Sequence, residues 1–133
     1  MENQNVQMIA NNGNVTISNA NSNLDGTGTL GLLLTAGSSS GAGGTLIRTI
    51  VIKATGNTSL GMIRLFVNNG SGPLLFREVM VPANDQTGVV PTFSYTVNDS
   101  LRLQPGSRLY ASTQNSETFN VIANGNDIIN CSC

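Results

Sequence analysis

The side chains that most often perform catalysis are scarce in this sequence and are not grouped. Its 133 residues include no histidine, no tryptophan and a single lysine, Lys53. Without histidine, none of the serines can be activated by a serine–histidine pair, and no supporting motif near Lys53 indicates a serine–lysine pair. We therefore expect that the protein is not an enzyme.

The acidic residues are spread along the chain. They are Glu2, Asp25, Glu78, Asp85, Asp99, Glu117 and Asp127. Hydrolysis by two carboxylates needs a pair about 5–10 Å apart in a cleft, and no short acidic motif suggests such a pair. Residues 124–127 (NGND) offer oxygen ligands around a glycine, but they lack the succession of acidic residues that a calcium loop uses. We expect no bound metal ion.

A glycine pattern at residues 26–31 (GTGTLG) matches the G-x-G-x-x-G motif of dinucleotide-binding loops. That site requires a strand before the glycines and a helix after them, so that backbone N–H groups point at the pyrophosphate. Here an asparagine-rich segment precedes the motif and a leucine-rich run follows it. The match therefore does not predict a dinucleotide site, and we expect no cofactor.

The two cysteines, Cys131 and Cys133, lie two residues apart near the C-terminal end. Alternate side chains of an extended strand lie about 6.5–7 Å apart, which is too far for a relaxed disulfide. A zinc site would need further histidine or cysteine ligands. We expect a reduced tail, and interchain disulfides in an oligomer are the alternative that stays open.

Short alternating apolar runs separated by Gly- and Asn-rich turns make up most of the chain, and no helical period is present. Strands are expected near residues 29–36, 45–54, 61–69, 73–81, 91–98, 107–113 and 117–123, with a turn at 124–125. This pattern predicts an all-β fold: a single antiparallel β-sandwich, jelly-roll-like, with seven to eight strands. We assign residues 1–28 to a polar N-terminal arm, 29–130 to the sandwich and 131–133 to a C-terminal tail.

A hairpin is expected over residues 61–81, because Asn and Gly in the turn at 69–72 accept the positive φ angles that such turns require. We expect Arg64 to face Glu78 and to form a structural ion pair with it. The same register places Met62 opposite Met80, Ile63 opposite Val79, Leu65 opposite Arg77, Phe66 opposite Phe76 and Val67 opposite Leu75.

The charge pattern excludes some partners and favours others. The net charge is −1 and the six basic residues are scattered singly, so nucleic acid is not an expected partner. No segment approaches the roughly 20 apolar residues that cross a bilayer, and the N-terminal residues do not resemble a secretory signal. A polar, nearly neutral surface favours contact with other proteins, so we expect a homo-oligomer. A trimer is preferred, with a dimer or a monomer held in a lattice left open.

Residues 50–83 and 90–125 carry a recurring pattern. It consists of an isoleucine-rich strand, Ala-Thr-Gly at 54–56, Arg-Leu-Phe at 64–66, an Asn-Gly hairpin, Arg-Glu-Val at 77–79, Ala-Ser-Thr at 111–113 and Phe-Asn-Val at 119–121. In this pattern the chain resembles a group of small structural virion proteins of tailed bacteriophages. The resemblance covers residues 45–125 and leaves out the first 28 residues and the C-terminal tail.

The resemblance implies a structural component of a virus particle. We expect a capsid decoration or auxiliary (cement) protein that is assembled in the host cytoplasm and binds the major capsid protein, or other virion proteins, on the outer surface of the head. The alternative is a tail or fibre component that binds a host-surface receptor or glycan. The lack of tryptophan and the presence of only two tyrosines count against a sugar site built on an aromatic platform.

The N-terminal residues are the expected means of attachment. They contain Val6, Met8, Ile9, Val15 and Ile17 among polar residues. These are too few to form a core but enough to add an extended segment to the sheet edge of a neighbouring protein. The alternative is that residues 15–18 form an edge strand of this domain itself.

Overall fold

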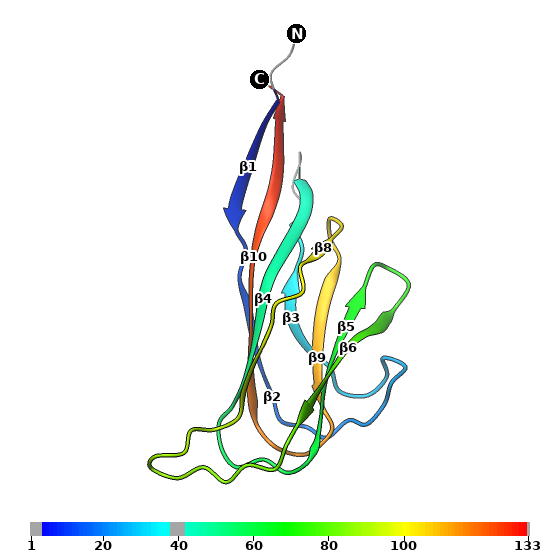
Figure 1. Cartoon of the computed structure of the whole chain (residues 1–133). Coiled ribbons are helices and arrows are strands. Elements are labelled where there is room, and N and C mark those ends of the chain that lie inside the picture. Colours follow the sequence, from blue (N-terminus) through cyan, green and yellow to red (C-terminus); the bar gives the residue numbers. More distant parts are fainter. Residues whose placement is uncertain (1–3, 38–41, 133) are drawn as a thin grey trace.

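The computed structural model describes the backbone of residues 4–37 and 42–132, and the side chains of residues 7–37 and 43–129. All the regular secondary structure in this part of the chain is β-strand (Figure 1). The strands are β1 (Gln4–Ala10), β2 (Gly13–Ile17), β3 (Gly31–Thr35), β4 (Ala42–Ala54), β5 (Gly61–Asn68), β6 (Pro73–Val81), β7 (Ser94–Val97), β8 (Leu101–Leu103), β9 (Arg108–Thr113) and β10 (Phe119–Ser132).

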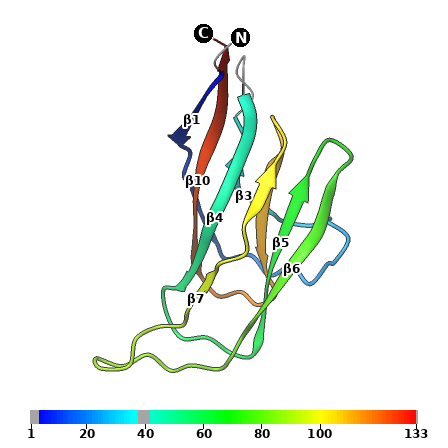
Figure 2. The ribbon, with the colours of Figure 1, turned by 45° about the horizontal axis from the view of Figure 1, so that its top comes forward.

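The strands form two antiparallel sheets, which Figures 1 and 2 show from two directions. In the first, sheet A, β1 and β2 follow one another along one side of β10, β4 pairs with the other side of β10, and β7 and β8 pair with the far side of β4. In the second, sheet B, the order is β3-β9-β5-β6. The all-β, sandwich-like architecture expected from the sequence is thus confirmed.

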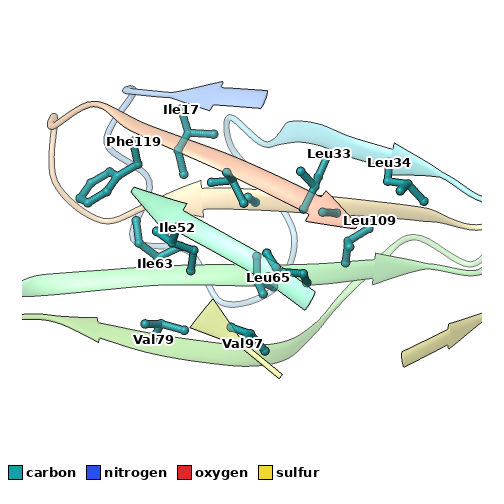
Figure 3. Close-up of a cluster of buried hydrophobic side chains, with 14 of the residues drawn as sticks. Ile17, Leu33, Leu34, Ile52, Ile63, Leu65, Val79, Val97, Leu109 and Phe119 are labelled. Carbon is teal, nitrogen blue, oxygen red and sulfur yellow. The ribbon is translucent and has the colours of Figure 1, made fainter. Parts of the chain in front are cut away.

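The core lies between the two sheets, because alternate side chains of each strand point to the same face. Sheet A contributes Ile50 and Ile52 of β4 and Val121 of β10, and sheet B contributes Ile63 and Leu65 of β5. Figure 3 labels Ile52, Ile63 and Leu65 among them. All five are at most 2% exposed. Burial of this apolar surface, at about 25 cal/mol per Å², is the main force that holds the sheets together.

Three expectations about the strands are corrected. The described residues form ten strands, where seven to eight were expected; the additional strands are β1, which was assigned to the arm, and β8, which has only three residues. The strand expected at 91–98 is limited to β7, Ser94–Val97. No turn interrupts the chain at Asn124–Gly125: β10 continues to Ser132, and a register shift against β4 at these two residues accommodates the glycine within the sheet.

The first 28 residues are not separate from the sandwich. β1 and β2 both pair with β10 of the same chain, and Ile17 belongs to the core. Residues 15–17 therefore lie in an edge strand of this domain, which was the alternative to a free arm. At the other end, β10 extends through Ser132, so the assigned tail begins inside a strand.

The hairpin of β5 and β6 has the expected register over half of its length. Arg64 lies opposite Glu78 and Leu65 opposite Arg77. A β-bulge follows, so that Phe66 faces Leu75 where Phe76 was expected, and Val67 faces Leu74 where Leu75 was expected. A bulge inserts one residue into one strand and shifts the pairing beyond it, which alternation in the sequence does not reveal.

The connection between β2 and β3, residues 18–30, runs over the outer face of sheet B. Ala20 forms a bridge with Thr113 of β9, and Gly26 lies against the main chain of Pro73 at the start of β6. Alternation with Ile63 and Leu65 places Arg64 and Phe66 on this outer face, and both are buried. The 18–30 connection thus lies over a second buried layer, outside the main core.

Candidate functional site

The five residues expected to provide attachment are divided between surface and core. Met8 and Ile9 of β1 are 45% and 50% exposed. Val15 is partly buried against the core, and Ile17 is only 6% exposed. Val6 pairs with Asn130 in the backbone register, but its side chain lies outside the described residues. Ile17 is therefore a packing residue, and the expectation that it provides attachment is corrected; Val15 packs partly against the core and keeps part of its surface in a groove of sheet A.

Met8 and Ile9 lie on a part of sheet A that extends beyond sheet B. We call this part the projecting ribbon: it consists of β1, the last part of β10 from residue 126, and β4 from residue 42 to residue 45 (Figures 1 and 2). Gln4 lies opposite Ser132, so β1 begins beside the end of β10. The ribbon thus presents a three-stranded sheet at one end of the molecule.

A polar cluster closes the core where the ribbon begins. Oδ1 of Asp127 accepts hydrogen bonds from Nδ2 of Asn11 at 2.8 Å and from Oγ1 of Thr45 at 2.5 Å. The Thr45 hydroxyl is fully buried and also accepts a bond from the Gly37 backbone N–H at 3.0 Å. Oδ1 of the partly exposed Asp127 is thus bonded within the protein, and the buried Thr45 hydroxyl has the partners that a buried polar group requires.

No group of three or more His, Cys, Asp or Glu side chains that could hold a metal occurs among the described residues. In the 124–127 segment, Asn124 Nδ2 donates to Oγ1 of Thr49 at 3.1 Å, and Asn126 Oδ1 accepts from Nε of Arg48 at 2.7 Å. The side chains of this segment therefore tie β10 to β4.

The free edge of the ribbon is β1. Among the described strands, β1 pairs only with β10, so one row of its backbone N–H and C=O groups is available to another strand. Its sequence, QNVQMIA, contains no charge and no proline, the two features that commonly protect an edge strand. Met8 and Ile9 project to opposite faces because they are consecutive residues of a strand. Arg48 lies beside Met8, with Nη2 at 3.9 Å from the sulfur atom.

A shallow groove of about 320 Å³ lies on sheet A where β2 pairs with β10. It is lined by Asn14, Val15, Thr16, Asn120 and Ile122. Thr16 donates to Oδ1 of Asn120 at 2.8 Å across the β2–β10 pair, and Ile122 is 39% exposed. The groove offers amides, a hydroxyl and aliphatic surface, but none of its lining residues is aromatic.

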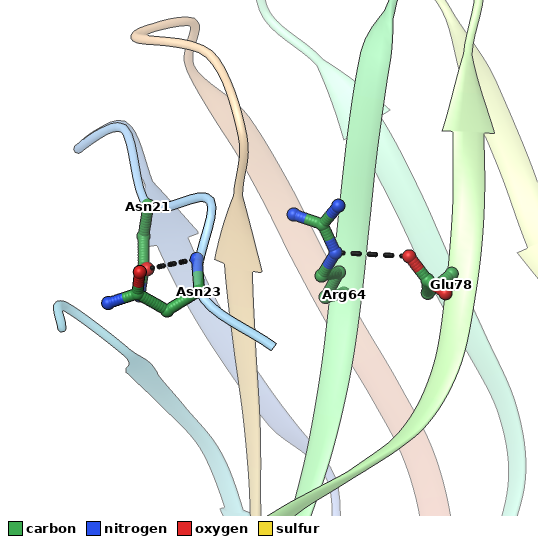
Figure 4. A network of polar contacts seen from close by, with 4 residues as sticks. All are labelled: Asn21, Asn23, Arg64 and Glu78. Atoms are coloured by element: carbon green, nitrogen blue, oxygen red, sulfur yellow. Dashed lines mark hydrogen bonds and ion pairs between the residues drawn. The ribbon is translucent and has the colours of Figure 1, made fainter. Parts of the chain in front are cut away.

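Arg64 and Glu78 form an ion pair on the outer face of sheet B (Figure 4). Nε of Arg64 donates to Oε2 of Glu78 at 3.1 Å, with the Arg64 side chain 9% exposed and the Glu78 side chain 42% exposed. Nη1 of Arg64 is buried and has no hydrogen-bond partner within the described part of the chain. The pair joins β5 to β6, and the burial of the Arg64 side chain suits a structural role.

Two polar features have no signal in the sequence. Arg77 forms an ion pair with Asp99 in the β7–β8 turn, which links the β6 edge of sheet B to sheet A. Asn21 is 5% exposed: its Nδ2 donates to the carbonyl groups of Thr27 and Thr29 at 3.0 and 2.9 Å, and its Oδ1 accepts from the Asn23 N–H at 3.0 Å. Asn21 thereby organises the 18–30 connection.

No protein-family model matches the chain, and no curated protein is similar to it in sequence. Over the residues described, the structure contains no helix that is long and apolar enough to cross a membrane.

Proposed function

We propose that this protein is a structural component of a tailed-phage virion, a decoration or auxiliary protein on the outer surface of the head. In this proposal a jelly-roll-like sandwich is the rigid body and the projecting ribbon is the means of attachment. The observation that supports it is the uncharged free edge of β1, with Met8 and Ile9 exposed on a sheet that extends beyond the core.

Attachment at β1 uses the physical properties of an edge strand. A strand of the major capsid protein that pairs with β1 gains main-chain hydrogen bonds, and the two apolar side chains select the surfaces that fit on either face. The polar cluster around Asp127 separates the ribbon from the core, so docking at β1 leaves the packing between the sheets unchanged. A nearly neutral surface limits the charge that must be desolvated when copies are mounted on a lattice.

The location on the particle is tested by counting copies in virions of the phage that encodes the chain. Quantitative mass spectrometry should find a copy number of the same order as that of the major capsid protein, and image reconstruction should place the protein on the head. A few copies confined to the tail would contradict decoration and would favour a tail or fibre component that binds a receptor.

The role of the ribbon is tested by adding purified protein to heads from a phage that lacks its gene. Met8→Asp combined with Ile9→Asp places charges on both faces of β1, so this double variant should not bind. Leu24 and Leu60 are exposed apolar residues away from the ribbon, and Leu24→Asp with Leu60→Asp is the matched control that should bind fully. Full occupancy by the ribbon variant would show that β1 is not the anchor.

The proposal includes self-association into a trimer, because cyclic assembly covers neutral polar surfaces and fits a three-fold position on a capsid. Light scattering of the purified protein at micromolar concentration should give the mass of three chains. A stable monomer at that concentration would contradict the trimer without affecting the location of the protein on the head.

A further inference from the structure

The chain contains three Asn-Gly pairs: Asn12–Gly13, Asn69–Gly70 and Asn124–Gly125. In such a pair the glycine nitrogen can attack the asparagine side-chain amide, because glycine has no Cβ to obstruct the approach. We propose that Asn69 is a site of spontaneous covalent modification, a deamidation assisted by Ser107 and Asn68, and that the other two pairs are protected by the sheets.

The reaction needs an accessible backbone at the pair and space for the ring to close, and the β5–β6 turn provides both. Asn69 and Gly70 are both exposed. Gly70 has a φ of 114°, and within the described part of the chain no atom outside its immediate neighbours lies within 4 Å of the position that a Cβ would occupy. The turn can therefore adopt the closed geometry of the reaction without displacing other residues.

Two hydrogen bonds at this turn favour the attack. Oγ of Ser107, a residue that is 3% exposed, donates to Oδ1 of Asn69 at 2.7 Å. Negative charge develops on this oxygen when the amide carbon becomes tetrahedral, and a positioned donor stabilises that charge. The N–H of Gly70 donates to Oδ1 of Asn68 at 2.8 Å, which polarises the bond whose proton must leave.

The chemistry is complete with water as the only co-reactant. The Gly70 nitrogen forms a bond to Cγ of Asn69, the Cγ–Nδ2 bond breaks, and ammonia leaves with the proton lost by Gly70. Water then opens the resulting cyclic imide at one of its two carbonyl carbons. Opening at Cγ yields aspartate, and opening at the main-chain carbon yields isoaspartate, which adds a methylene to the backbone of the turn.

Sheet A holds the glycines of the other two pairs: Gly13, which follows Asn12, is the first residue of β2, and Asn124–Gly125 lies within β10. Gly13 pairs with Ala123 in sheet A, and the position of a Cβ on Gly13 is 2.0 Å from the carbonyl oxygen of Leu33. Gly125 pairs with Ile47, and the corresponding position is 2.7 Å from the carbonyl oxygen of Leu46. Ring closure at either glycine would require the surrounding strands to separate.

Modification would change the surface beside the turn. A hollow of about 170 Å³ is lined by Asn68, Gly70, Gly106 and Arg108, and Arg108 pairs with Asn68 across β9 and β5. A new carboxylate at position 69 adds one negative charge to a chain of net charge −1, and it arises at the Ser107 hydroxyl, next in sequence to Arg108. Aged molecules would thus differ from new ones at this end of sheet B.

The experiment follows all three pairs in the folded, full-length protein. The protein is incubated at mildly alkaline pH in water labelled with heavy oxygen and is then digested with trypsin. Cleavage after the lysine and arginine residues places the pairs in three separate peptides: 1–48, 65–77 and 109–133. Mass spectrometry should find labelled aspartate and isoaspartate first in peptide 65–77, whereas in denaturant the three peptides should react at similar rates.

Variants at Ser107 and Asn69 test the assistance directly. Ser107→Ala should slow the modification of Asn69 about tenfold, on the scale of one hydrogen bond, and Ser107→Thr should retain the rate because it keeps a hydroxyl. Asn69→Gln should leave peptide 65–77 unlabelled at this position. Continued protection of Asn12 and Asn124 shows that a variant is folded. Faster deamidation at Asn12 or Asn124 than at Asn69 in the native protein would overturn Asn69 as the site of modification. An unchanged rate in Ser107→Ala would show that Ser107 does not assist the reaction.

Discussion

Gly13 of β2 lies so close to the main chain of Leu33 in β3 that a Cβ at position 13 would be 2.0 Å from the Leu33 carbonyl oxygen. β2 belongs to sheet A and β3 to sheet B, so the two sheets meet along this side of the sandwich. Gly31 of β3 contributes to the same closure, because a Cβ there would contact Val15 and Ile17. Two strand edges therefore cover one another, whereas the edge of β1 stays open.

Replacing Gly13 should destabilise the protein through this contact. Gly13→Ala places a methyl group against a backbone carbonyl that cannot move without separating the sheets, and we expect a loss of about 3 kcal/mol in the free energy of unfolding. Gly56→Ala is the control, since that position is open among the described residues. Urea denaturation measures both variants. Equal stability of the two would show that the edges of β2 and β3 can move apart freely.

Asn21 should be the most sensitive residue of the 18–30 connection. Its buried amide makes two donor bonds and one acceptor bond, so Asn21→Ala should cost about 2–3 kcal/mol and should expose the outer face of sheet B. Asn19→Ala removes an exposed amide and serves as the control. Limited proteolysis should cleave the Asn21 variant first between residues 18 and 30, and unchanged resistance there would contradict this role.

The two members of the Arg64–Glu78 pair should not be equivalent. Glu78→Ala leaves a buried guanidinium without its partner and should cost about 1–2 kcal/mol, a value reduced because Glu78 is partly exposed. Arg64→Met removes the charge together with the unpaired Nη1 atom, so its stability should stay within about 1 kcal/mol of the native protein. Thermal unfolding compares these variants with Asp85→Asn at an exposed site. A larger loss of stability for Arg64→Met than for Glu78→Ala would contradict this prediction.

Asp25 should titrate below the ordinary carboxyl range. The Thr27 hydroxyl and then the Thr27 backbone N–H donate to its carboxylate and lower the pKa of Asp25 from 3.8. A lowered pKa in the folded state means that these bonds contribute fully above pH 3.8 and are lost as the pH falls through the lowered value. Carboxyl NMR measures this pKa, and Thr27→Ala should raise it. An unchanged value in the variant would rule out Thr27 as the cause.

Local pattern determined most of the strands. The alternation of Ile50, Ile52 and Ala54 predicts which face of β4 is buried, and the Asn-Gly turn predicts the β5–β6 hairpin, because both depend on residues close in sequence. The same local pattern predicts the register of that hairpin as far as the pair of Leu65 and Arg77, where the β-bulge begins. The lack of histidine and of clustered acidic residues is likewise a property of composition, from which we expected no catalytic site.

Tertiary structure alone decided the position of the N-terminal residues. Val15 and Ile17 are as apolar as Met8 and Ile9, yet the first two lie opposite β3 and pack against the core, while the last two lie where sheet B has ended. The bonds of Asp127 with Asn11 and Thr45, and the Arg77–Asp99 pair, join distant segments. A sequence pattern reports which face of a strand is apolar, but the other sheet decides which part of that face is covered.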